Sequence, residues 1–476
     1  MKYAQLFIFL LSLSYSFDLL ANLQSAQDLF SKRSGVGTRV DLEIARELTK
    51  EKMYFTAVPF IKEYIASGTG GSKETLDNVI DDVITEVGTK QFEIFPSQIL
   101  DRINSPMIRY VRAKKYFRLG KYQETVQELK YDFSPSQIVH PFALNLEASA
   151  NAILKNYEKA NLLYKECVLE SNKNIKSSLS SGRLKQLEVN RDTCIVGSPR
   201  ALFAGQKFSE AHNDYLDLPK SSSIWPEILF EEAWNSFYMK DYNRTLGKLV
   251  TYNAPIFDYY FNPEIEVLKA LTYLQLCLWD DAKKVIDDFY QRYEKEAFII
   301  NEIISKRTND FKYFYLLGKS QMEGKISNDS LLSSMLSFII KDPTYIDMYE
   351  QFVTGKEELT KIKTVGDSGF RKTLALNLRE SLRLQRELIG SYVRRRLIQF
   401  RNQMTKSFEG MSYVKLEILG GKKTDLYSFN ASTKRDRGDI AYVSRNEKQY
   451  FWTFNGEFWA DELGDYVFSL KSECSK

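Results

Sequence analysis

The chain has 476 residues, of which 43% are apolar and 27% charged, and its 66 basic and 62 acidic residues leave a net charge of only +4. This composition excludes disorder over most of the length, and the weak net charge gives no indication of a nucleic-acid partner. Only 11 prolines and 23 glycines interrupt the chain, which favours long helices. With two histidines, His140 and His212, the sequence argues against an enzyme, and we expect neither a cofactor nor a metal site.

Residues 1–21 have the pattern of a secretory signal peptide. The positive charge of Lys2 is followed by a mostly apolar stretch from Tyr3 to Phe17, which is too short to span a membrane. We expect cleavage after Ala21, or alternatively after Ser16, and no cysteine stands near this region to carry a bacterial lipid anchor. The alternative is a buried N-terminal helix. The pattern predicts an exported, periplasmic protein without a transmembrane span.

Short aromatic turns recur along the next part of the chain. In each turn an aromatic ring is followed three residues later by a small side chain. The rings are Tyr54, Tyr122, Tyr157, Phe208, Tyr242 and Trp279, and the small residues are Ala57, Thr125, Ala160, Ala211, Thr245 and Ala282. Most neighbouring rings are about 34 residues apart, and the interval from Tyr54 to Tyr122 is about twice that length. The interval from Tyr157 to Phe208 is longer than one repeat, which an insertion explains.

This period resembles the tetratricopeptide repeat (TPR), whose unit is a pair of antiparallel helices. The resemblance covers roughly residues 40–295, and Ala113, Ala148, Ala233 and Ala270 support it because each stands nine residues before a ring. Threonine in place of alanine at 125 and 245 departs from the family pattern. The resemblance implies an all-α fold with a TPR-like solenoid over residues 22–296. We expect one further unit near residues 88–92, and an exposed loop with a short helix at 182–189 within the polar insertion 168–191.

Four cysteines allow three disulfide pairings in an exported protein. We favour Cys167–Cys194 and Cys277–Cys474, because the first pair lies at the junction of two neighbouring repeats. Free buried thiols are the alternative.

The TPR resemblance also implies that the first helix of each unit lines a groove. The polar or mixed candidates are Lys114, Phe117, Asn145, Ser149, Arg200 and Phe203, and the apolar ones are Phe230, Trp234, Phe237, Val267, Leu271 and Leu274. Six large apolar side chains in adjacent units are too extensive a surface to leave open in a soluble monomer. We expect either the long helix described below or a partner helix or peptide to cover them.

Helical patterning continues over residues 297–420. It predicts helices at 311–326 and 330–340, a new start at Asp342-Pro343, and a long amphipathic helix at 371–419 whose apolar residues recur every three or four positions. Between 371 and 409 this helix has ten basic residues against three glutamates. A solvated polar face explains the charge, and peripheral contact with an anionic envelope surface is the alternative.

Residues 421–476 predict a small β-containing cap, with strand-like runs at 439–443, 449–454 and 466–470 and a turn at Asn455-Gly456. Its most distinctive residues are Trp452, Glu457, Trp459, Asp461 and Glu462. This stretch resembles the C-terminal signature of exported repeat proteins from predatory and gliding deltaproteobacteria, as do Glu231–Trp234 and Leu276–Ala282.

Taken together, these patterns predict a non-enzymatic periplasmic scaffold that binds other envelope proteins through its repeat groove, in a complex of motility or envelope assembly. The alternative is a cell-wall glycan binder or hydrolase, in which carboxylates of the cap stand beside sugar-stacking tryptophans.

Overall fold

A computed structural model describes residues 23–68, 73–130, 139–177, 181–326, 330–366, 368–425, 440, 443 and 449–474. The described part of the chain is mostly helical, which confirms the expected all-α class, and its strands are only two residues long. The predicted signal peptide lies outside the described residues. No described helix has the length and hydropathy needed to cross a bilayer. The chain divides into two compact units, Met1–Cys194 with Ile346–Ile389, and Ile195–Tyr345 with Gly390–Lys476.

Unit 1 contains short helices that follow one another closely along the chain. They are η1 (Gly37–Val40), α2 (Asp41–Lys50), α3 (Tyr54–Ser67), α4 (Lys73–Val87), α5 (Lys90–Glu93), α6 (Ser97–Leu100), α7 (Pro106–Arg118), α8 (Tyr122–Leu129), α9 (His140–Ile153) and α10 (Tyr157–Ser177). Residues 23–36 are also helical. Helix α11 (Ser181–Ala204) begins in this unit.

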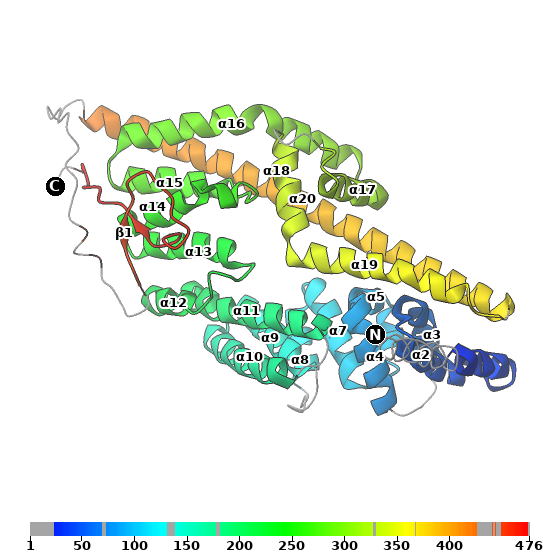
Figure 1. Ribbon diagram of the computed structural model, residues 1–476. Helices are drawn as coiled ribbons and strands as arrows, with labels where there is room; N and C mark the ends of the chain where they lie inside the picture. The colour runs from blue at the N-terminus through cyan, green and yellow to red at the C-terminus, as the bar shows by residue number, and fades with distance from the viewer. Residues whose placement is uncertain are drawn as a thin grey trace, which may run out of the picture. The chain divides into compact units, whose positions relative to one another are not determined.

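Unit 2 begins within α11 and ends with the C-terminal segment. Its elements are α12 (Phe208–Tyr215), α13 (Trp225–Tyr238), α14 (Tyr242–Val250), η2 (Thr251–Asn253), η3 (Pro255–Phe257), α15 (Glu264–Gln275), α16 (Trp279–Lys306), α17 (Phe311–Met322), α18 (Leu331–Lys341), β1 (Trp452–Thr453) and β2 (Tyr466–Val467) (Figure 1). Two further helices, α19 (Pro343–Ile362) and α20 (Ser368–Asp425), contribute residues to both units.

Six helical hairpins share one turn geometry. In each turn one residue has the left-handed conformation, two positions before the aromatic ring that starts the second helix. These residues are Lys52 (φ 53°), Gly120 (76°), Lys155 (64°), Gln206 (62°), Lys240 (63°) and Cys277 (58°). The next backbone N–H always donates to the carbonyl five residues earlier, as in Lys121 to Tyr116 and Asp241 to Ser236. This is the Schellman arrangement that ends a helix and reverses the chain.

The small residues of the repeat pattern are the contact points inside these hairpins. Their side chains are completely buried: Ala57, Thr125, Ala160, Ala211, Thr245 and Ala282 in the second helices, and Ala113, Ala148, Ala233 and Ala270 in the first helices. A small side chain at a helix crossing lets the two backbones approach closely. The aromatic turns of the sequence therefore mark six helical hairpins, each closed by the same turn hydrogen bond: α2–α3, α7–α8, α9–α10, α11–α12, α13–α14 and α15–α16.

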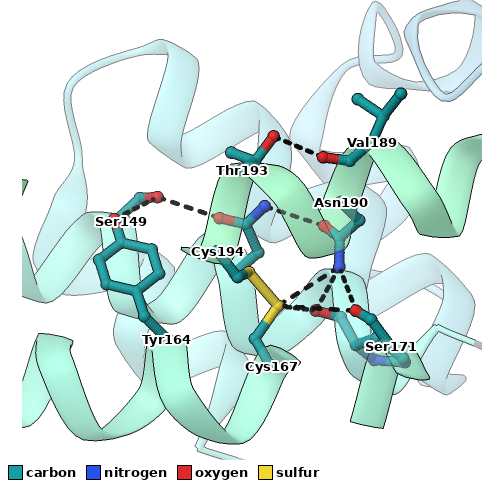
Figure 2. Close-up of a disulfide and its surroundings, with 10 residues drawn as sticks. Ser149, Tyr164, Cys167, Ser171, Val189, Asn190, Thr193 and Cys194 are labelled. Carbon is teal, nitrogen blue, oxygen red and sulfur yellow. Dashed lines mark hydrogen bonds between the residues drawn. A yellow bond between two sulfur atoms is a disulfide. The ribbon is translucent and has the colours of Figure 1, made fainter. Parts of the chain in front are cut away.

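The prediction of an exposed loop at 168–191 was wrong. Helix α10 runs on to Ser177 and α11 starts at Ser181, so the inserted residues lengthen two helices instead of forming a loop. A disulfide joins Cys167 to Cys194 across these extensions, and both cysteines are completely buried (Figure 2). The polar composition typical of a loop is explained in part by Asn190, which is 6% exposed and donates hydrogen bonds to the Pro141 carbonyl (3.1 Å) and to the Ser171 hydroxyl (3.2 Å).

Two other boundaries differ from the sequence expectation. The unit expected near residues 88–92 is only the four-residue helix α5, which follows Gly88 in a left-handed conformation. The long helix does not end at Gly420 but continues to Asp425. Helical hydrogen bonding tolerates single glycines at a cost of about 1 kcal/mol each, so a glycine pair is a weak stop signal.

The C-terminal segment forms far less sheet than predicted. Strands β1 and β2 pair in parallel through Trp452 with Tyr466 and Thr453 with Val467, and the expected strand at 439–443 lies outside the described residues apart from Ile440 and Val443. The segment is nevertheless firmly attached to α14 and to the turn between α15 and α16. The Asn243 side chain accepts from the Leu470 N–H (2.9 Å) and donates to the Leu470 carbonyl (3.0 Å), and a disulfide joins Cys277 to Cys474.

Candidate functional site

The groove candidates of unit 1 are occupied by internal contacts. The Lys114 ammonium lies 5.6 Å from the centre of the Tyr110 ring, and the Phe117 ring packs edge-on against Tyr122 at 5.3 Å. Asn145 donates to the Asn190 side-chain oxygen at 2.9 Å and belongs to the polar network around the first disulfide, where Ser149 also lies (Figure 2). These side chains stabilise the hairpins and offer little free recognition chemistry.

Unit 2 presents a connected group of six aromatic rings, which we call the aromatic surface. It consists of Phe203 from α11, Phe208 from α12, Trp234, Phe237 and Tyr238 from α13, and Tyr242 from α14. Tyr238 stacks on Phe208 (5.3 Å between ring centres, 9° between planes) and meets Phe203 edge-on at 5.4 Å. Tyr238 is 52% exposed, and Phe203, Trp234 and Phe237 are half-buried. The rings are held by their neighbours and still accessible from outside.

A network of charged side chains lies one helical turn from two of these rings. The Arg200 Nε donates to both carboxylate oxygens of Glu231 (3.0 and 2.9 Å), and an Nη donates to Glu227 (2.8 Å). The hydroxyl of Tyr215 donates to the same Glu231 carboxylate at 3.2 Å. Burial lowers the pKa of Arg200 while Glu231 and Glu227 raise it, and the net shift is upward. Arg200 is three residues before Phe203 and Glu231 three before Trp234, so each charge shares a helix face with a ring.

The apolar candidates further along the chain are partly covered from within unit 2. A Cβ atom on Gly410 of α20 would lie only 2.8 Å from the Val267 side chain, so the two helices touch there. Phe408 meets Phe289 at 5.0 Å, and Phe400 meets Phe261 at 5.2 Å. The second part of α20 therefore packs along α15 and α16, beside which it also runs in Figure 1.

At the α15 end of the six apolar groove candidates, this packing agrees with the expectation that the long helix covers them. Val267 is 7% exposed, whereas Leu271 and Leu274 stay half-buried. Phe230, with 8% exposure, belongs to a buried cluster with Leu249 and Leu268, against which Trp234 and Phe237 pack. The hairpins themselves thus supply much of the cover. Sequence reasoning missed Tyr238, the most exposed ring of the aromatic surface.

The C-terminal signature residues lie on a supported surface. Trp452 is 48% exposed and Trp459 is 57% exposed. Both are held against Tyr466: Trp452 by strand pairing, and Trp459 by its backbone N–H, which donates to the Tyr466 hydroxyl at 2.7 Å. Glu457 and Asp461 are exposed and Glu462 is half-buried. Within the described residues none of these three carboxylates forms an ion pair.

The two histidines lie in α9 and α12, and the described residues contain no group of three His, Cys, Asp or Glu side chains arranged to hold a metal ion. The His212 Nε2 lies 2.8 Å from an Arg244 Nη and 2.6 Å from the Gln449 side-chain nitrogen. Since arginine only donates, this ring nitrogen is an acceptor that is already in use.

Comparison with protein-family models found no match, and no curated protein sequence matches the chain.

Proposed function

We propose that this chain is an exported, non-enzymatic scaffold whose TPR-type hairpins bind segments of other cell-envelope proteins. The observation that carries the proposal is the aromatic surface, with Tyr238 half exposed among hairpins that share one turn geometry. Rigid helices present such rings at little conformational cost to binding. Tyrosine, tryptophan and arginine are also the side chains that contribute most to the affinity of protein interfaces.

The charges beside the aromatic surface add orientation to this binding. The Arg200 side chain is 40% exposed and is held between Glu227 and Glu231. Its remaining N–H donors can therefore bind a carbonyl or carboxylate of a partner with little further loss of side-chain entropy. Because Arg200 has two carboxylate partners, the network has one excess negative charge, which favours a partner segment that contains both an apolar and a basic side chain. Such a segment places the apolar group on the rings and the positive charge on Glu227.

Export is supported by the two disulfides, since paired cysteines persist mainly in oxidising compartments such as the periplasm. The signal-peptide pattern of residues 1–21 points to the same compartment. Membership of a motility or envelope-assembly complex rests on the deltaproteobacterial resemblance of the C-terminal stretch.

Site-specific photo-crosslinking tests the scaffold proposal. A photoreactive amino acid in place of Tyr238, introduced in the living cell, is expected to give discrete crosslinks to envelope proteins. The matched control replaces Leu162 of α10, which is 68% exposed and lies outside the aromatic surface. Identical crosslinked products from both positions, or none from position 238, would contradict the proposal. Trp234→Ala should reduce the yield at position 238 by about thirtyfold or more at limiting partner concentration, because a central aromatic anchor contributes about 2 kcal/mol or more.

A second candidate, binding of cell-wall glycan, is favoured by the exposure of Trp452 and Trp459 and by the nearby carboxylates of Glu457 and Asp461, which form no ion pair with any residue that the structure describes. Sugars stack on exposed indole rings and hydrogen-bond to nearby carboxylates. Pelleting with purified peptidoglycan sacculi tests it: the full chain should sediment, and Trp452→Ala with Trp459→Ala should not. Tyr413→Ala, which removes a ring of 57% exposure from α20, serves as control. A chain that stays in the supernatant removes this candidate.

A further inference from the structure

A cavity of about 410 Å³ lies in unit 2 between α16, α18 and α20. Its floor consists of Ile300, Met335 and Met404, which are between 1% and 3% exposed. Phe298 and Phe408 form apolar walls, and Phe298 is 72% exposed. The volume lies within the range of about 300–1,000 Å³ that is typical of small-molecule sites.

The rim of the cavity is polar and carries one positive charge. Asn301, Asn402 and Thr405 stand there with Arg401. The Arg401 Nε and an Nη donate to the Asn402 side-chain oxygen (3.3 and 3.0 Å), which fixes the guanidinium and leaves three of its five N–H donors.

Arg401 has no carboxylate partner among the described residues. By contrast, Arg396 on the same helix is paired with Asp342 at 3.9 Å and lies over the rings of Phe338 and Phe400. A guanidinium that is held in place and not neutralised is the group that proteins use to bind carboxylate and phosphate.

We propose that this cavity binds a single-chain amphiphile with an anionic head group. The alkyl chain lies on Ile300, Met335 and Met404 and buries the exposed face of Phe298, while the head group accepts hydrogen bonds from Arg401 and from the Asn402 or Asn301 amide. Methionine side chains on the floor adapt to flexible chains, because the thioether has several low-energy rotamers and is polarisable. A carboxylate and a phosphate head group satisfy the same donors, and the binding experiment distinguishes them.

Isothermal titration calorimetry tests the proposal, with laurate and dodecyl phosphate below their micelle concentrations and dodecyl maltoside as the uncharged ligand of equal chain length. We expect one saturable site for at least one of the two anions, and binding of the maltoside at least tenfold weaker. The tighter of the two anions identifies the head group. Absence of saturable binding by either anion, or equal binding of the maltoside, would overturn the proposal.

Three variants locate the site. Arg401→Gln should weaken anion binding at least tenfold, since it removes a charge-assisted hydrogen bond to the head group. Thr405→Trp replaces an exposed rim residue, so that it obstructs the mouth without disturbing the core, and should abolish binding. Arg395→Gln removes an exposed charge of the same helix that does not line the cavity, and should leave binding unchanged. Binding that survives Thr405→Trp in a folded protein would place the ligand elsewhere and refute the assignment.

Discussion

The backbone of α14 at Gly247 lies directly against the carbonyl group of Tyr466, because a Cβ atom on Gly247 would stand only 1.7 Å from the Tyr466 oxygen. No side chain is compatible with this contact. Gly247→Ala should therefore displace the C-terminal segment from α14, although alanine in a helix normally gains about 1 kcal/mol over glycine. We expect faster proteolysis within residues 449–474 and a lower melting temperature.

Gly420→Ala is the matched control for this substitution. Gly420 is also in a helix, and a Cβ atom there would meet nothing within 4 Å. This variant should keep or slightly raise the melting temperature. Equal behaviour of the two variants would show that Gly247 does not hold the segment in place.

The left-handed turn residues provide a second prediction, at Lys240 with φ 63°. Lys240→Gly should raise the free energy of unfolding by about 1 kcal/mol, and Lys240→Val should lower it, because side chains in the left-handed region cost roughly 1–2 kcal/mol and a branched one costs more. By contrast, Lys295→Gly, at an exposed position inside α16, should lower the free energy of unfolding by about 1 kcal/mol. Urea unfolding measures all three; a stabilising Lys240→Val would contradict the turn geometry.

The features that could be predicted from the sequence depend on local interactions along the chain. The rings and small residues located the hairpins because a turn and the crossing beside it depend on residues close together in the chain. The insertion was mistaken for a loop because its polar composition hid Asn190, whose burial depends on Pro141, about 50 positions away. The sequence patterns also failed to predict the exposed Tyr238 and the cavity, because both depend on contacts between residues that are distant in the chain. The exposure of Tyr238 depends on Phe203 and Phe208, and the cavity needs three helices that are distant in sequence.

The two disulfides, which are the pairs favoured from the sequence, should differ in their reaction with thiols. Cys474 is exposed, whereas Cys167 and Cys194 are completely buried. Exchange requires access of an attacking thiolate to a sulfur atom. Mild reduction of the folded protein should therefore open Cys277–Cys474 first, and mass spectrometry after alkylation should find label on these two cysteines only. Label on Cys167 before denaturant is added would contradict the buried geometry.

His212 is surrounded by groups that disfavour its charged form. It is 6% exposed, its Nε2 accepts from Arg244, and Lys248, which forms an ion pair with Glu232, stands nearby. The Gln449 side chain closes the site from the C-terminal segment. Burial, followed by the positive charges of Lys248 and Arg244, lowers the pKa of His212 to about 3.

The stability of unit 2 should consequently decrease as the solution becomes acidic. Between the ordinary histidine pKa of about 6.5 and the folded value of about 3, the unfolded chain binds a proton that the folded chain does not, so this residue costs up to about 1.4 kcal/mol of stability for each pH unit below 6.5. His212→Gln keeps a hydrogen-bonding side chain but removes this titration. Its melting temperature should fall less than that of the unmodified chain between about pH 7 and pH 5. His140→Gln, in α9 of unit 1, controls for the loss of a histidine elsewhere. Parallel melting curves for the unmodified chain and His212→Gln over this interval would mean that the imidazole is not held neutral by its surroundings.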